Sequence, residues 1–193
     1  VSRGSILVDG VDIRDVKQHD LCEKIGYVPQ KGVLFSGTIE SNLRYADENA
    51  TDSTIENALE VSQAKEFVSK MPSGIEEPIS QGGTNVSGGQ KQRLSIARAL
   101  VKNADIYIFD DTFSALDYHT DALLREALNK MVKEKHSTVF IVAQRISSIM
   151  HADKIIVLDQ GKIVGNGTHA ELMKNCPVYQ EIAYSQLSKE ELN

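Results

Sequence analysis

The hydrophobic pattern in the first part of the chain predicts β-structure followed by a helical section. An apolar run at residues 6–8 and an alternating segment at residues 11–14 flank Asp9-Gly10, a dipeptide that favours a two-residue hairpin turn. Residues 18–23 suit a short helix, and the apolar run at residues 24–28 predicts a strand that a proline ends. Apolar residues then recur at helical spacing over residues 38–71, with a polar break at residues 49–53.

The rest of the chain alternates between predicted strands and helices. A glycine-rich loop at residues 81–89 leads into a helix that runs to residue 102, a strand at 105–110 and a helix at 121–135. Two more strands follow at 138–143 and 154–158, with a short helix between them. The chain then forms an antiparallel strand at 161–164 and a helical region that Thr168 caps. Both faces of residues 138–143 are apolar, which is typical of a strand buried in a parallel sheet. The alternation predicts an α/β fold with a parallel core, into which the section from residue 38 to residue 102 is inserted as a helical lobe.

Charge and cysteine content narrow the possible partners. Lys and Arg total 21 against 27 Asp and Glu, a net charge of −6, and neither a basic run nor a basic stripe with aromatic residues occurs. We therefore expect no nucleic-acid partner. Cys22 and Cys176 have no neighbours at metal-ligand spacing, which favours free thiols in a reducing cytoplasm. No apolar stretch approaches the roughly 20 residues of a membrane span, so any membrane connection is expected from another segment or chain.

A glycine turn lies directly before the helix that runs to residue 102. Its residues are Ser87, Gly88, Gly89 and Gln90. The free N–H groups and positive dipole end of a helix start attract anions, and glycines permit close approach. In isolation, Ser87 acting as a plain N-cap explains the same residues, so the turn alone does not establish a site.

Three aspartates follow the strand at residues 105–110. Asp110 and Asp111 lie at its carboxyl end, where ligands bind in open α/β sheets, and two adjacent carboxylates suit a magnesium ligand beside a residue that handles a water. An N-cap with a turn residue is the alternative for this pair. Asp117 could simply cap the helix that begins near Tyr118.

Two glutamines also follow predicted strands. Gln30 could lend its carbonyl oxygen to a metal or a water, although a glutamine in a loop is commonly just solvated. Gln144 ends the strand at residues 138–143, where its neutral amide could position a phosphate oxygen but could not exchange a proton near neutral pH. A strand-end residue bonded to backbone is the alternative for Gln144.

The order and spacing of these residues together resemble the ATPase domain of ABC transporters. In that family, Gln30 matches the Q-loop, residues 86–90 the signature motif, residues 106–110 Walker B, residues 114–117 the D-loop, and Gln144 the switch position. Residues 32–43 resemble the exporter subclass. The resemblance implies a P-loop NTPase core at residues 1–30 and 103–193, with a parallel sheet and a small antiparallel β part. It implies a helical subdomain with the signature motif at residues 31–102.

The resemblance also implies the cofactors, partners and residue roles. ATP and Mg²⁺ would be the cofactors, with Asp110 and Gln30 at the metal. A second nucleotide-binding domain would pair head to tail with this one, and a transmembrane domain would hold both at the cytoplasmic face of the membrane. The resemblance implies catalytic roles for Asp111 and Gln144. It implies contacts with ATP for Gln30, Ser87, Gly88, Gly89, Gln90 and Asp117.

One part of the family pattern does not occur in these 193 residues. The family has a glycine-rich loop ending in Gly-Lys-Ser/Thr, which grips the phosphates and which the resemblance places shortly before Val1. The strand of that loop would lie between the strands that end at Gln144 and near Leu158. We therefore expect the chain by itself to bind ATP poorly and, with two unpaired strand edges, to be unstable or to aggregate.

The second departure is chemical. The family usually has Glu after the Walker B aspartate and His at the switch, where this chain has Asp111 and Gln144. The Asp111 carboxylate falls about 1.5 Å short of the glutamate position, and losing a positioned acid–base group typically costs about 10²- to 10⁴-fold in rate. Gln81 likewise replaces an acidic residue that many exporters carry. With an intact signature, this pattern resembles the degenerate half of a heterodimeric exporter.

Two alternatives stand beside that interpretation. The chain could be a truncated, catalytically inactive ABC fragment without autonomous ATP binding. It could also resemble soluble ABC-type ATPases of DNA repair or chromosome organisation, but those interrupt this region with long coiled coils, and no sustained heptads occur here.

Overall fold

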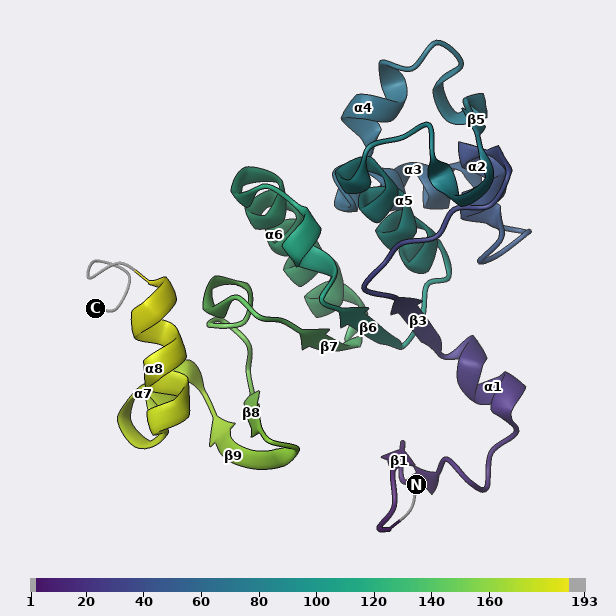
Figure 1. Ribbon diagram of the computed structural model, residues 1–193. Coiled ribbons are helices and arrows are strands. Elements are labelled where there is room, and N and C mark those ends of the chain that lie inside the picture. The colour runs from purple at the N-terminus through teal and green to yellow at the C-terminus, as the bar shows by residue number, and fades with distance from the viewer. Residues whose placement is uncertain (1–2, 188–193) are drawn as a thin grey trace. The chain divides into compact units, whose positions relative to one another are not determined.

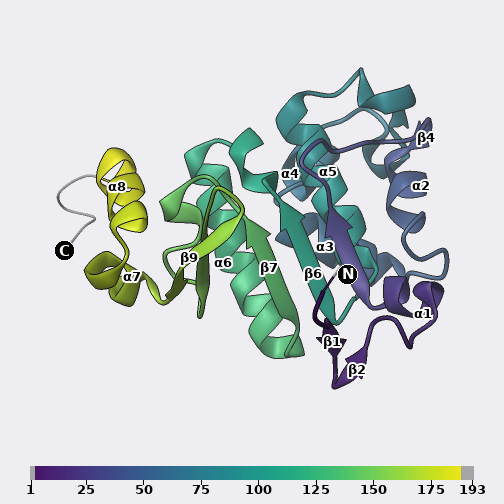
Figure 2. The ribbon, with the colours of Figure 1, turned by 60° about the horizontal axis from the view of Figure 1, so that its bottom comes forward.

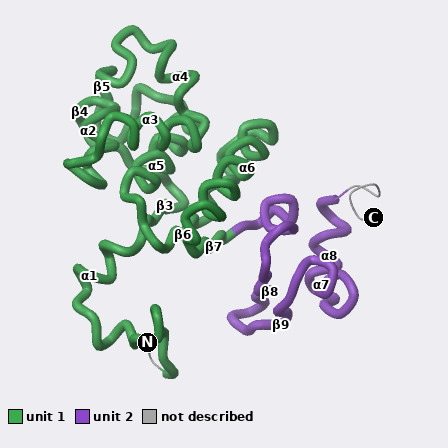
Figure 3. Tube along the Cα trace, turned by 180° about the vertical axis from the view of Figure 1, so that it is seen from behind, with its two compact units in different colours: residues 1–142 green, residues 143–193 purple. Residues whose placement is uncertain are grey.

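The structure is a computed structural model that describes residues 3–187. The chain divides into two compact units, Val1–Val142 and Ala143–Asn193 (Figure 3). The predicted core at residues 1–30 and 103–193 and the predicted helical subdomain at residues 31–102 stay predictions, because the two units divide after Val142 instead.

A three-stranded parallel sheet organises the first unit. It contains β3 (Ile25–Val28), β6 (Ile106–Asp110) and β7 (Thr138–Val142) in the order β3-β6-β7. The ladder pairs Val28 with Phe109 and Asp110 with Val142, so the carboxyl ends of all three strands lie along one edge. The predicted α/β fold with a parallel sheet is confirmed.

Helices α5 (Gly88–Val101) and α6 (Tyr118–Lys135) cover one face of this sheet (Figure 2). Tyr107 and Phe109 point into that core and are fully buried, together with Leu94 and Leu124 from the two helices. The opposite face carries apolar side chains that are more than half exposed, namely Tyr27 (53%), Phe140 (56%) and Val142 (53%). The predicted burial of both faces of residues 138–143 is therefore wrong, because among residues 3–187 the helices of this unit cover only one face.

The helical lobe packs into the same core through α5. It contains α2 (Ile39–Arg44), α3 (Asp52–Val61), α4 (Lys65–Ser69) and a β4 (Gly37–Thr38) to β5 (Pro78–Ile79) bridge. Two 3₁₀ turns, η1 (Gly74–Glu76) and η2 (Gln81–Gly83), follow α4. Thr38 and Thr51 cap α2 and α3 by accepting backbone N–H groups, and this places the break between the two helices at residues 45–51.

The N-terminal hairpin and the helix after it have the predicted positions. Strands β1 (Leu7–Val8) and β2 (Val11–Asp12) pair antiparallel, and helix α1 (Gln18–Glu23) follows. Asp9 and Gly10 both have left-handed φ angles, of 51° and 80°. Aspartate and glycine are the residues that such a hairpin turn favours.

The second unit combines a hairpin with two helices (Figure 1). After a 3₁₀ turn at η4 (Ile146–Ser148), strands β8 (Ile155–Asp159) and β9 (Lys162–Gly167) pair antiparallel, and α7 (His169–Asn175) and α8 (Pro177–Gln186) follow. Thr168 and Glu171 form a capping box at α7, as the sequence predicts for Thr168. Within residues 3–187, β8 pairs only with β9 and β7 only with β6, so each strand has one unpaired edge.

No helix among residues 3–187 is both long enough and apolar enough to cross a membrane.

Candidate functional site

Asp110 and Asp111 lie at the carboxyl edge of the parallel sheet. Asp110 is the last residue of β6, and the Asp111 N–H donates to the carbonyl of Val142 at 2.9 Å, which extends the ladder by one residue. Asp111 has left-handed backbone angles, φ 44° and ψ 31°, and is only 9% exposed. Aspartate tolerates this conformation better than most residues. The chain then turns into η3 (Thr112–Ala115), whose Ser114 hydroxyl donates to the Asp111 carbonyl at 2.8 Å.

Gln30 reaches the same edge from the end of β3. Its Nε2 donates to Oδ2 of Asp111 at 3.1 Å, although 81 positions separate the two residues in sequence. The buried hydroxyl of Thr112 donates to the Val28 carbonyl at 3.3 Å and holds the two strand ends together. The structure thus brings together Gln30, Asp110 and Asp111, and their chemical roles stay predictions.

Tyr27 joins this group, and sequence reasoning missed it. Its hydroxyl donates to Oδ2 of Asp110 at 3.2 Å. Loss of hydration raises the pKa of Tyr27, and the hydrogen bond to the Asp110 carboxylate raises it further. The available signal was strand periodicity, because Tyr27 is paired with Ile108, two residues before Asp110 and on the same face. That signal becomes useful only once the register is known.

The donors at this edge fit a magnesium ion. Mg²⁺ is usually bound through one or two carboxylates together with substrate phosphates and waters. The Asp110 carboxylate and the Oε1 atom of Gln30 are oxygen donors of that kind. Within residues 3–187, no cluster of three or more His, Cys, Asp or Glu side chains could hold a metal. A cation here would therefore take its other ligands from a nucleotide, water or another segment.

The glycine tip, which we define as residues 87–90, forms the N-terminus of α5. Ser87 and Gln90 make a reciprocal capping box: Ser87 Oγ accepts the Gln90 N–H at 3.2 Å, and Gln90 Oε1 accepts the Ser87 N–H at 2.9 Å. The N-cap interpretation of Ser87 is therefore confirmed. A capped start does not exclude a ligand, because the Ser87 O–H and the N–H groups of Gly88 and Gly89 remain donors at the positive end of a 14-residue helix.

Nothing within the described chain requires a glycine at position 88. A Cβ built on Gly88 would meet no atom within 4 Å, and one built on Gly89 would come no closer than 3.8 Å to the Ala115 carbonyl. Glycine lowers helix stability by about 0.5–1 kcal/mol relative to alanine. The missing side chain at position 88 thus leaves space for a group that approaches the tip from outside.

Asp117 is the N-cap of α6. Its Oδ1 accepts the Thr120 N–H at 2.9 Å, and its Oδ2 accepts the Thr120 hydroxyl at 2.8 Å. These bonds, the backbone one first, hold the pKa of Asp117 below its usual value. The capping interpretation is confirmed, and a contact of Asp117 with ATP stays a prediction.

Gln144 belongs to the second unit, two residues after Val142. Its carbonyl accepts Nε2 of Gln186 at 2.9 Å, and Oε1 of Gln186 accepts the Ile146 N–H at 2.8 Å. The end of α8 therefore fixes the backbone at this position. The switch role of the Gln144 side chain stays a prediction.

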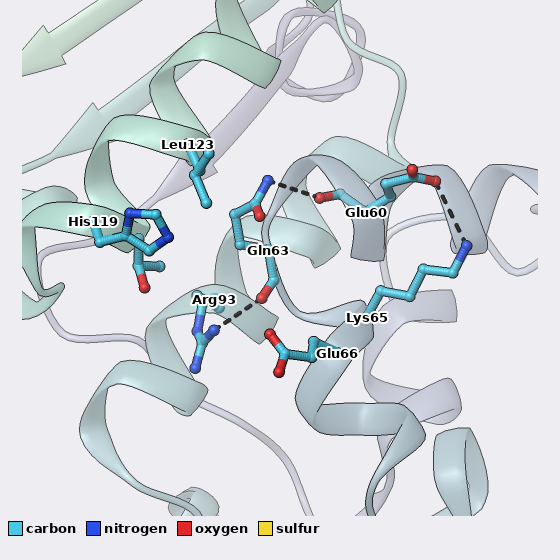
Figure 4. A pocket seen from close by; sticks show the side chains of 8 residues that line it. Glu60, Gln63, Lys65, Glu66, Arg93, His119 and Leu123 are labelled. Atoms are coloured by element: carbon cyan, nitrogen blue, oxygen red, sulfur yellow. Dashed lines mark hydrogen bonds and ion pairs between the residues drawn. The ribbon is translucent and has the colours of Figure 1, made fainter.

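A cavity of about 450 Å³ lies elsewhere in the first unit, between the helical lobe and α6 (Figure 4). Arg93 Nη1 donates to the Gln63 carbonyl at 2.9 Å on its wall, and burial lowers the pKa of Arg93. Charges of both signs face the cavity, and none of the candidate site residues lines it. The lining residues are Glu60, Gln63, Lys65, Glu66, Arg93, His119, Thr120 and Leu123.

Nearly all of the chain is similar in sequence to known proteins. The family model described as ABC transporter matches residues 1–114. The chain is 47% identical over 189 residues to an uncharacterized ABC transporter ATP-binding protein of Mycobacterium bovis, covering 96% of this chain and 32% of that protein. It is 39% identical over 180 residues to the ATP-dependent lipid A-core flippase of Desulfotalea psychrophila, covering 93% of this chain and 31% of the flippase.

A solved structure gives the same fold. The structure of a bacterial Atm1-family ABC exporter with ATP bound superposes with a TM-score of 0.92 and 36% identity, covering 97% of this chain and 33% of that one. The chain spans about a third of the length of these relatives.

Proposed function

The chain belongs to the ABC transporter family, and we propose that it is the ATP-binding, energy-coupling module of an ABC exporter. In this proposal it works at the cytoplasmic face of the membrane with a transmembrane domain and a second, non-identical nucleotide-binding domain. Its glycine tip completes the ATP site held by that second domain, while its own site turns ATP over slowly.

The open space at Gly88 is the observation that carries the proposal. The capping box presents the tip as an ordered helix start, and no packing contact within 4 Å explains the glycine at position 88. An N-terminus with free N–H groups and no side chain in the way suits close contact with a phosphate. The matching phosphate would be the terminal one of ATP bound to the second domain.

The residues at the sheet edge would serve the chain's own nucleotide. Mg²⁺ would neutralise phosphate charge there, with the Asp110 carboxylate and Gln30 Oε1 among its ligands. Asp111 is buried and hydrogen-bonded to Gln30, and in this proposal it takes the role of the residue that polarises the attacking water. Its side chain is shorter than glutamate, and Gln144 cannot become cationic beside the phosphate. Both features support slow turnover at this site.

The test uses the full-length transporter with and without candidate partner subunits. We expect Asp111→Glu and Gln144→His, singly and together, to give little ATP hydrolysis when the protein is expressed alone, because the proposal requires a partner. With the partner present, the double variant should hydrolyse ATP faster than the natural sequence. Robust hydrolysis by a homodimer of the natural sequence would contradict the asymmetric role.

A further inference from the structure

We infer that Gln92 is a positioning residue, which fixes the loop that carries Gln30 to the helix that carries the glycine tip. We define the glutamine loop as residues 29–33. The inference rests on the proposed function and adds to it a residue that couples the chain's own ATP site to the partner's.

Gln92 holds the glutamine loop on both sides of Gln30. It lies in the second turn of α5 and is only 3% exposed. Its Oε1 accepts the Gly32 N–H at 3.2 Å, and its Nε2 donates to the Pro29 carbonyl at 3.4 Å. One side-chain amide therefore satisfies two backbone groups of a loop about 60 residues away in sequence.

Gly32 packs closely against α5. A Cβ at Gly32 would come within 2.5 Å of Ser95 Oγ and 3.0 Å of Gln92 Oε1, so the loop lies directly against α5. Ser95 is itself held, because its hydroxyl donates to the Lys91 carbonyl at 2.9 Å. One turn further, Arg98 Nη2 donates to the Val33 carbonyl at 2.8 Å.

The other side of the loop faces the sheet edge. Gln30 Nε2 donates to Asp111, and the strand that leads into the loop is held by Thr112. The glutamine loop is thus bonded at once to Asp111 and to α5. The described contacts run from Asp111 through Gln30 and the loop to Gln92.

The direction of coupling follows from this arrangement. A nucleotide and its metal would bind Gln30 through Oε1, the amide atom that is not bonded to Asp111, and would shift the loop through this side chain. Gln92 transmits that shift to α5, and the tip begins five residues earlier, about 7.5 Å along the helix axis. A displaced loop therefore displaces the group that touches the partner's ATP.

The test compares two variants of the full transporter assembled with its partner. Gln92→Met keeps a similar volume and removes both bonds to the loop. Ser95→Ala is the matched control, because it changes a buried polar residue of the same helix without removing either bond.

Hydrogen exchange measures the bond directly, without ATP turnover. In Gln92→Met, we expect the amide of Gly32 to exchange about 3- to 10-fold faster, while Ser95→Ala stays near the natural protein. We also expect Gln92→Met to lower kcat about five-fold, with KM for ATP changed much less, because the lost contact acts on the geometry of the reacting site. Combined with Gln30→Ala, its effect on kcat should be non-additive.

The outcomes separate the two proposals. The inference is overturned if the Gly32 amide of Gln92→Met exchanges at the natural rate. It is also overturned if exchange is faster but kcat is unchanged, or if the effects of Gln30→Ala and Gln92→Met on kcat are additive. Those results leave the proposed function intact. A natural transporter that hydrolyses no ATP would overturn the proposed function itself, and the coupling role of Gln92 with it.

Discussion

Asp111 combines a functional position with a backbone conformation that few residues adopt. Its φ of 44° places it in the left-handed region, and its amide is bonded to Val142 while its side chain accepts from Gln30. Asparagine shares the tolerance of aspartate for this region, whereas a β-branched residue does not. The conformation and the charge of this residue can therefore be separated by substitution.

We expect Asp111→Val to lower the free energy of unfolding by about 1–3 kcal/mol, because valine is strained at this φ. Asp111→Asn should unfold close to the natural protein, since it keeps the backbone preference and an acceptor for Gln30. Thermal unfolding of the purified transporter, with both variants side by side, measures the difference. Equal melting temperatures for Val and Asn would contradict the left-handed geometry.

The cap at Asp117 predicts a pH dependence of stability. Hydrogen bonds from Thr120 hold the pKa of Asp117 below its ordinary value of 3.8. A lowered carboxyl pKa stabilises the fold above the unfolded-state pKa, and this stabilisation is lost as the pH falls through the folded-state pKa.

The matched variant is Asp117→Asn, which keeps a good N-cap without a titrating charge. The natural protein should therefore lose melting temperature between about pH 4 and pH 2 more steeply than Asp117→Asn. Asp117→Ala, which has no cap, should melt lower than both at pH 7. Parallel acid profiles for the natural protein and Asp117→Asn would rule out the predicted contribution.

At the scale of elements, β3 packs tightly against α5 and β6 at Gly26. A Cβ at Gly26 would meet the Tyr107 ring at 2.7 Å and the Ala99 carbonyl at 3.1 Å. The Tyr107 ring is fully buried and the Ala99 carbonyl belongs to the backbone, so neither moves aside freely and a larger residue at position 26 overpacks this contact. Gly88, at the start of the same α5, has open space instead.

We expect Gly26→Ala to destabilise the protein by about 1–3 kcal/mol, the usual cost of overpacking a core. Gly88→Ala is its matched control and should melt at the same temperature or slightly higher, since alanine is the better helix former. The comparison uses thermal unfolding of the two purified variants. A Gly88→Ala protein that melts as low as Gly26→Ala would show that position 88 is packed after all.

The elements that sequence predicts well are those with local signals. Thr168 and Asp117 cap helices that begin one residue later, and Asp9-Gly10 forms the expected turn. One local signal gave a wrong boundary: the hydrophobic pattern predicts that the helix begins at residue 121, whereas α6 begins three residues earlier, at Tyr118. The cap at Asp117 is the better marker there, because polar first-turn residues hide the start of a helix from a hydrophobic pattern.

The site could be predicted only in part. The sequence predicts Asp110 and Asp111 as site residues because the carboxyl ends of parallel strands meet at one edge of a sheet. It predicts Gln30 because the order of the motifs resembles a known family. The bonds of Tyr27 to Asp110 and of Gln92 to Gly32 span 83 and 60 positions. They depend on strand register and on helix rotation, which a single sequence does not determine.

At the scale of the whole molecule, each unit exposes an apolar sheet face. In the first unit this face includes Tyr27, Phe140 and Val142, and in the second Ile156 and Leu158, which are 54% and 67% exposed. In the part of the chain that the structure describes, β7 and β8 each have an edge that pairs with no other strand, and such an edge can pair with another chain. Apolar faces of this kind favour self-association unless another surface covers them.

We therefore expect residues 1–193, expressed alone, to self-associate and to bind a dye that reports exposed apolar surface. Sedimentation velocity across a concentration series measures this, and replacing Phe140 and Leu158 by threonine should reduce it. A monodisperse monomer with one cooperative melting transition would contradict the expectation.

The account depends most on the glycine tip touching ATP that another subunit holds. The most direct measurement is ATP turnover by the assembled transporter carrying Gly88→Leu, with its melting temperature recorded on the same sample. Because the position has open space inside the chain, we predict an unchanged melting temperature and a loss of turnover of about 10²-fold or more. Turnover equal to that of the natural transporter would contradict the central claim.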